Sequence, residues 1–282
     1  MSRIYDALKK LEAERTGGGG GNGHGGGEGN GHGNGNGHGG NGGARRRLWQ
    51  WLFGNGRTKT NGALSLNFQL GPDLEEAYQR LGTNLLVSPG ATVAQGPKLL
   101  GVAASRHGEG ATTTAAVFAS ILTRRRGGRV CVVEANLRSP SFERVFGAHP
   151  EGGFAELIRG ERTLAEVTQS TQVPNMFAIP CGQAPLGASA LFDSAGLAAA
   201  LEQLRGAFDF VIFDLPPVNL YGEASIIGPR LDAALIVIEA DRTRIPEVER
   251  SRRALERVGV KLVGSVLNRR RTYIPAFLEE LL

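Results

Sequence analysis

Six apolar runs, separated by helical patterns, constrain the fold of this chain more than any other feature. Strands alternating with helices imply right-handed crossovers and a parallel sheet covered by helices on both faces. We therefore predict an α/β fold built on a parallel sheet, with ligands at the carboxyl ends of the strands. The apolar runs read as buried strands at residues 99–104, 130–134, 176–179, 210–213, 233–238 and 262–267, and helices are predicted at 74–86, 112–125, 154–168, 196–205 and 247–258.

The first 70 residues have a different composition from the rest. Of the 42 glycines, 18 lie in the stretch 17–43, so residues 16–44 are predicted to form a flexible linker. Residues 1–15 carry one apolar stripe and are interpreted as a docking helix, with packing on the chain's own domain as the alternative. Residues 45–70 form a connecting segment, and the folded domain is predicted at 71–282.

The connecting segment pairs cations with aromatic rings. Arg45 to Phe53 places both tryptophans of the chain beside three arginines. Such a pairing suits an anionic membrane surface or a groove on a partner protein. A short helix that packs on its own domain is the alternative interpretation.

Composition argues against several classes of protein. The net charge of +5 lies in short clusters, so no dedicated nucleic-acid binding is expected. Cys131 and Cys181 lack metal-binding spacing, so neither a zinc site nor a disulfide framework is predicted. There is no run of about 18 apolar residues and no apolar signal core near the N-terminus. We expect a cytoplasmic protein whose contact with the inner face of the membrane would be peripheral.

The turn after the first predicted strand has a phosphate-loop pattern. Residues 105–113 read Ser-Arg-His-Gly-Glu-Gly-Ala-Thr-Thr and lie between a strand and a helix. In this context backbone N–H groups and a helix N-terminus can surround a phosphate. Against G-x-x-x-x-G-K-[ST], Gly110 takes the second glycine, Thr112 the magnesium hydroxyl, and Ala111 the place of the lysine. A glycine-rich turn also forms for backbone reasons alone, so both readings stay open at this point.

Further segments of the domain share a recognisable pattern with the loop. They are Glu76-Ala77-Tyr78 with Thr83-Asn84-Leu85, Asn136 to Pro140, Gly153 to Leu157 with Arg159-Gly160, Phe208 to Asp214 with Pro216-Pro217-Val218, Asp232 to Ile238 with Thr243, and Gly264 with Val266 to Asn268. Together they resemble the cytoplasmic kinase domain of the bacterial tyrosine kinases (BY-kinases) of capsule and exopolysaccharide synthesis. That family is a branch of the deviant P-loop ATPases, which also includes partition and septum-positioning ATPases.

The resemblance implies ATP and Mg²⁺ as cofactors and assigns roles to individual residues. Thr112 and Asp214 would hold Mg²⁺, Glu134 and Asp214 would be the catalytic carboxylates, and Tyr273 in the tail would be phosphorylated. The nucleotide-binding residues would be Gly108, Glu109, Gly110, Ala111, Thr112, Thr113 and, facing the base, Asn268.

Four departures from the family pattern shape the functional hypothesis. Ala111 replaces the phosphate-loop lysine, Glu134 and Asn136 replace an Asp-x-Asp pair, and the tail keeps only Tyr273. In the helix that the family uses for ring assembly, Gln79 and Gly82 replace two arginines. We therefore favour a catalytically degenerate monomer or weak dimer that regulates or scaffolds a membrane polysaccharide co-polymerase. The alternatives are an active tyrosine autokinase that uses Arg106 or a partner's cation, and a partition or positioning ATPase.

Overall fold

The computed structural model describes residues 71–87, 98–126, 128–149, 151–183 and 188–270. The predicted docking helix, the glycine linker, the connecting segment and Tyr273 lie outside these residues. No helix within the described ranges is both long and apolar enough to span a bilayer.

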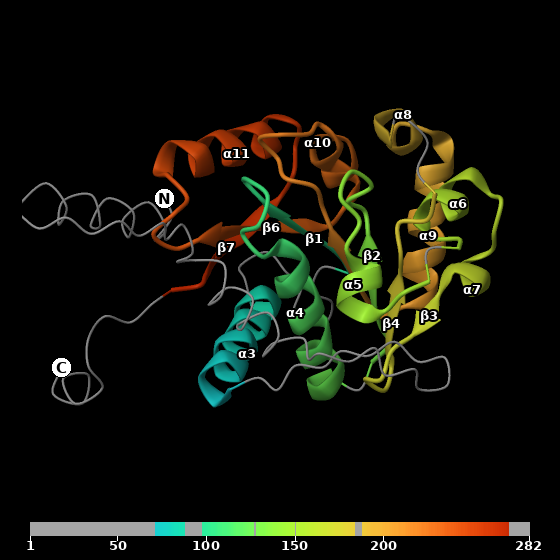
Figure 1. The fold of residues 1–282 in the computed structure, drawn as a ribbon, viewed down its shortest axis with the longest axis horizontal. Coiled ribbons are helices and arrows are strands. Elements are labelled where there is room, and N and C mark those ends of the chain that lie inside the picture. The colour runs from blue at the N-terminus through green and yellow to red at the C-terminus, as the bar shows by residue number, and fades with distance from the viewer. Residues whose placement is uncertain (1–70, 88–97, 127, 150, 184–187, 271–282) are drawn as a thin grey trace, which may run out of the picture. The chain divides into compact units, whose positions relative to one another are not determined.

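A single sheet of seven strands forms the centre of the described domain, in the order β3-β4-β2-β5-β1-β6-β7 (Figure 1). All neighbouring pairs are parallel except β3 with β4, which is antiparallel. The six predicted strands are therefore confirmed, while the two-residue edge strand β3 was too short to show a pattern. The strands are β1 (Leu99–Ala104), β2 (Val130–Glu134), β3 (Gln169–Ser170), β4 (Met176–Ile179), β5 (Phe210–Asp214), β6 (Ala233–Glu239) and β7 (Leu262–Asn268).

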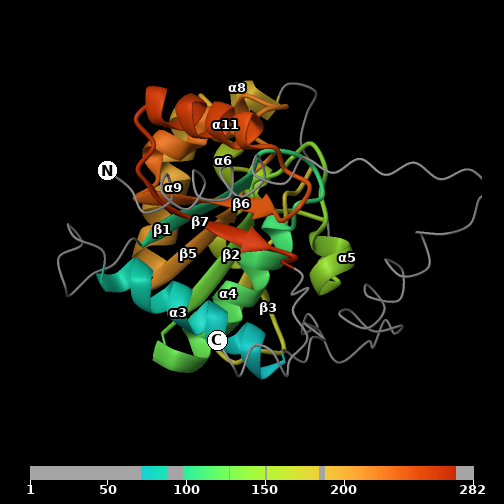
Figure 2. The same ribbon diagram turned by 90° about the vertical axis from the view of Figure 1, so that its left-hand side faces the viewer.

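Helices cover both faces of this sheet, as a parallel sheet requires (Figures 1 and 2). One face packs against α3 (Pro72–Val87), α4 (Ala111–Arg126) and α5 (Phe142–Phe146). The other face packs against α6 (Phe154–Arg159), α7 (Leu164–Val167), α8 (Ala188–Phe192), α9 (Ala195–Ala207), α10 (Glu223–Ile227) and α11 (Ile245–Arg257), with the 3₁₀ turn η1 (Gly228–Arg230) after α10.

The pleat of the strands divides their side chains between two buried cores. In β1, for example, Leu100 and Val102 face the core beneath α3 and α4, whereas Leu99 and Ala103 face the opposite core. Both sets are almost completely buried, which explains why the strands read as continuous apolar runs.

The single helix predicted over 154–168 is wrong. Gly160 ends α6 with a left-handed φ of 71°, and Thr163 then starts α7 by accepting a hydrogen bond from the Glu166 N–H. Gly160 can adopt this conformation because it has no Cβ. The short helices α5, α8 and α10 were not predicted either, because five residues are too few to show a helical period.

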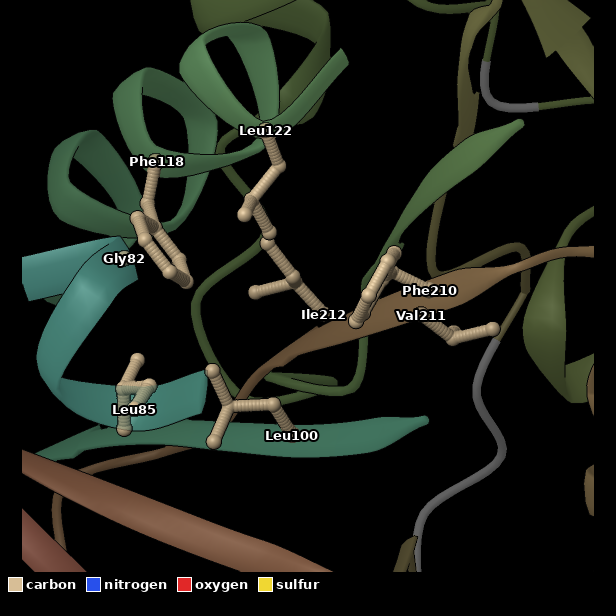
Figure 3. A pocket seen from close by; sticks show the side chains of 8 residues that line it. All are labelled: Gly82, Leu85, Leu100, Phe118, Leu122, Phe210, Val211 and Ile212. Carbon is tan, nitrogen blue, oxygen red and sulfur yellow. The ribbon is translucent and has the colours of Figure 1, made fainter. Parts of the chain in front are cut away.

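Helix α3 packs closely on α4 at Gly82, which is buried. A Cβ built on Gly82 would lie 3.6 Å from Phe118 Cε2 and 3.9 Å from Leu122 Cδ2. Figure 3 shows the small apolar pocket beside this contact, lined from α3, α4, β1 and β5. Position 82 therefore faces α4 in this structure, and its role in ring assembly stays a prediction.

Gly82→Ala is expected to stabilise the domain by about 1 kcal/mol, because alanine favours helix over glycine and its Cβ would make ordinary van der Waals contacts. In a folded domain of roughly 200 residues this corresponds to a rise in Tm of about 2–4 °C. Thermal unfolding of the two proteins measures it. Gly206→Ala in α9 is the control, because no neighbouring atom lies within 4 Å of the new Cβ. It measures the effect of helix propensity without a change in packing. A lower Tm for Gly82→Ala alone would show that α3 and α4 approach too closely for a methyl group.

Candidate functional site

The loop between β1 and α4 presents a row of unused backbone donors. Gly108 and Gly110 have φ angles of 85° and 98°, in the region that favours glycine. Among the described residues, no acceptor receives a hydrogen bond from the backbone N–H groups of residues 108–113. Consecutive free N–H groups at a helix N-terminus form an anion-binding concavity. The loop therefore fits a phosphate group without any side-chain charge from Ala111.

Hydrogen bonds of the Glu109 side chain hold this loop in place. Glu109 is buried, and its Oε2 accepts hydrogen bonds from the N–H groups of Ser105 (2.7 Å) and Arg106 (3.0 Å). Its Oε1 accepts from Thr243 Oγ1 at 2.5 Å. The Glu109 side chain thus fixes the loop, and only its backbone N–H remains available to a phosphate.

Asn268, at the end of β7, lies directly against the loop. Its Nδ2 donates to the Glu109 carbonyl at 2.8 Å, and a Cβ on Gly110 would lie only 2.1 Å from the same nitrogen. Glycine at 110 is therefore required by this contact as well as by its φ angle. The structure brings Asn268 to the nucleotide loop, while its role toward a base stays a prediction.

Thr112 and Asp214 form the centre of the candidate site. Thr112 lies in the first turn of α4, and Asp214 lies at the end of β5. Thr112 Oγ1 donates a hydrogen bond to Asp214 Oδ2 at 2.6 Å. Asp214 is almost fully buried, and its Oδ1 has no hydrogen-bond partner among the described residues. Burial raises the pKa of Asp214 to about 8; the negative charge of Glu134 adds to this rise, and the Thr112 hydrogen bond opposes it.

This pair fits a magnesium ion. A hydroxyl and a carboxylate are hard oxygen ligands, and Mg²⁺ is commonly bound by one or two carboxylates, water and phosphate oxygens. The unpartnered Asp214 Oδ1 is a buried polar atom whose hydrogen-bonding need is unmet, which is costly unless a cation or its water satisfies it. Thr112 and Asp214 would hold the ion, and the ion would balance phosphate charge.

Glu134 lies at the end of β2, beside the strand that carries Asp214. It is paired in register with Asp214 on the neighbouring strand. Its Oε1 accepts from the N–H groups of Ser141 and Phe142, and its Oε2 accepts from the Cys181 N–H at 3.0 Å. Burial raises the pKa of Glu134, and these N–H donors oppose the rise. The structure therefore shows a carboxylate that joins β2, α5 and the segment after β4; its catalytic role stays a prediction.

A second group of polar side chains surrounds the loop and was missed at the sequence level. Arg138 Nε donates to the buried Glu223 at 2.7 Å, and its guanidinium lies 5.5 Å from the centroid of the Tyr221 ring. The Tyr221 hydroxyl lies 3.3 Å from His107 Nε2, in the phosphate loop. The family-like segment around Arg138 was the available signal, but its partners Tyr221 and Glu223 follow strand β5 and become its neighbours only through folding.

Arg106 does not replace the missing lysine in this structure. It is exposed, and its NH1 lies 3.5 Å from Glu247 Oε2 on α11. Tyr78 is buried, with its hydroxyl 3.4 Å from Thr114 Oγ1. Asn136 accepts a hydrogen bond from the Ser139 N–H at 3.3 Å.

The parallel sheet, the glycine loop and the buried carboxylate at the adjacent strand end together define a P-loop ATPase fold. No protein-family model matches the chain. The tyrosine-protein kinase CpsD of Streptococcus agalactiae is 28% identical over 196 residues, which cover 69% of this chain and 83% of that protein. The kinase domain of the Escherichia coli tyrosine kinase ETK has the same fold, with a TM-score of 0.68 and 24% identity over 80% of this chain and 90% of that one.

A more distant neighbour shares the fold and was solved with a nucleotide. Cobyrinic acid a,c-diamide synthase from Mycobacterium smegmatis, with bound ATP analogue and magnesium, has a TM-score of 0.53 and 24% identity, covering 60% of this chain and 74% of that one. Within the P-loop ATPases, the sequence of this chain is similar to that of a bacterial tyrosine kinase of the capsule type, and its fold is that of the kinase domains of such enzymes.

Proposed function

We propose that this protein binds ATP with Mg²⁺ but is a catalytically degenerate BY-kinase (a pseudokinase), which regulates or scaffolds a membrane polysaccharide co-polymerase in capsule or exopolysaccharide export. One observation carries the proposal. The Thr112–Asp214 pair and the free loop N–H groups are retained, whereas the two charged positions beside them are altered. Position 111 has no charge, and the Glu134 carboxylate is occupied by backbone donors.

The missing lysine affects binding and turnover unequally. A hydrogen bond to a charged group contributes about 1.5–3 kcal/mol, so its loss weakens ATP binding by roughly 10- to 100-fold while the backbone donors remain. The rate of phosphoryl transfer is expected to fall by a larger factor than the affinity for ATP, because transfer depends on charges that stabilise the transition state more than the ground state. Regulation by nucleotide binding tolerates this change better than catalysis does.

An active tyrosine autokinase is the second candidate, because the relatives of the chain are named tyrosine kinases and the Thr112–Asp214 pair is intact. It requires a cation to replace the lysine, from Arg106 after rearrangement or from a partner protein. Tyr273 would then be the acceptor.

The cellular setting belongs to the same proposal. The protein would be cytoplasmic and would reach the inner face of the membrane through residues 1–15 or 45–70, whose sequences suit docking. Glycosyltransferase and chain-length regulator genes beside its gene would support polysaccharide export. A neighbouring gene for a DNA-binding protein would instead favour the partition ATPase alternative.

Phosphate release and autophosphorylation with Mg²⁺ separate the two candidates. We expect the full chain to bind an ATP analogue, while its turnover equals that of Asp214→Asn within error. Because Asp214 Oδ1 has no partner, the substitution should leave the fold intact, which thermal unfolding checks. Turnover or phosphotyrosine that disappears in Asp214→Asn would contradict the pseudokinase proposal and support the autokinase.

A further inference from the structure

Ser141 stands at the N-cap of α5 without performing the usual task of that position. A serine there normally accepts a hydrogen bond from an N–H of the first helical turn. The Ser141 side chain makes no such bond. Instead, Glu134 accepts from the N–H groups of Ser141 and Phe142, so the carboxylate serves this end of the helix.

Because the Ser141 hydroxyl does not cap α5, it is available for another contact, and it lies at the candidate metal site. Ser141 is 8% exposed, and its Oγ lies 3.5 Å from Thr112 Oγ1. Thr112 in turn donates to Asp214 at 2.6 Å. Three oxygen-bearing side chains therefore converge from three elements: the starts of α4 and α5 and the end of β5.

The contact between the two hydroxyls is long for a hydrogen bond between oxygens, whose usual separation is about 2.7–2.8 Å. It suits two hydroxyls that lie beside the same metal-bound water. Octahedral Mg²⁺ binds oxygen at about 2.0–2.1 Å, so a water next to Thr112 in the metal shell would lie about 3 Å from Thr112 Oγ1. The buried Asp214 Oδ1, which has no partner among the described residues, is an independent sign that this position needs a positive charge or its water.

We propose that Ser141 is a third protein oxygen of the magnesium site, where it holds a water of the metal shell beside Thr112 and Asp214. The inference rests on the proposed nucleotide-binding function. Glu134 is the positioning residue, because its carboxylate fixes the Ser141 backbone.

The test is the Mg²⁺ concentration that gives half-maximal binding of a fluorescent, non-hydrolysable ATP analogue to the full chain. Loss of one neutral hydrogen bond should raise this concentration about 3- to 10-fold in Ser141→Ala. Binding without Mg²⁺ should be unchanged. Ser141→Thr keeps the hydroxyl and should restore the wild-type value. Ser139→Ala, two residues earlier on the exposed part of the same loop, is the matched control and should match wild type.

Each result has a separate meaning. If wild type shows no Mg²⁺-dependent binding, the proposed function fails and the inference falls with it. If wild type responds and Ser141→Ala responds identically, the inference alone is overturned. Equal weakening with and without Mg²⁺, together with a lower Tm, would show that Ser141 is merely structural and would also overturn it.

Discussion

Ala111→Lys is expected to tighten ATP binding by about 10- to 100-fold, the reverse of the loss assigned to the missing charge. Ala111 is the first residue of α4, next to the free N–H groups of the loop. An ammonium group there would add a charge-assisted contact to phosphate. Equilibrium titration with a fluorescent ATP analogue measures the change.

Ala111→Met is the matched control, because it adds a stem of similar length without charge. Its affinity should remain close to that of wild type, and the gain in Ala111→Lys should fall as salt rises. Equal affinities for the lysine and methionine variants would show that side chains at 111 do not reach the phosphates. Strong tyrosine autophosphorylation in Ala111→Lys would show that one added charge suffices for catalysis. It would also show that Glu134, at the second altered position, does not prevent phosphoryl transfer.

Glu134→Ala is expected to lower the free energy of unfolding by about 3 kcal/mol or more. The substitution leaves three backbone N–H groups, those of Ser141, Phe142 and Cys181, without their acceptor in a buried region. Each unsatisfied buried donor costs about 1–3 kcal/mol, and a typical domain is stable by only about 5–15 kcal/mol. Chemical denaturation measured by circular dichroism gives the difference.

Two milder variants keep this prediction testable if Glu134→Ala does not fold. Glu134→Gln retains one acceptor oxygen, but its amide N–H₂ would oppose one of the backbone donors, so an intermediate loss is expected. Glu134→Asp shortens the stem and should also lose part of the stability, although it restores the residue typical of the family. Glu151→Ala, at an exposed carboxylate, should change little. A fully stable Glu134→Ala protein would show that the three N–H groups find other acceptors.

The sequence by itself predicted the strands and the loop, and its resemblance to the bacterial tyrosine kinases supplied the Thr112–Asp214 pair. Buried parallel strands are continuous apolar runs, so their positions follow from local composition. The glycine loop and Asp214 lie at the ends of two such strands, and parallel strands bring those ends to one edge of the sheet. The close approach of Thr112 to Asp214 agrees with that expectation.

Only the tertiary structure decided which contacts the altered residues make. The carboxylate of Glu134 accepts hydrogen bonds from backbone N–H groups that lie 7, 8 and 47 residues away in the chain, and its catalytic role stays a prediction. Gly82 faces α4, and its part in ring assembly stays a prediction as well. A buried carboxylate must find donors and a helix must pack on a neighbour, and those partners come from distant segments that no local pattern records.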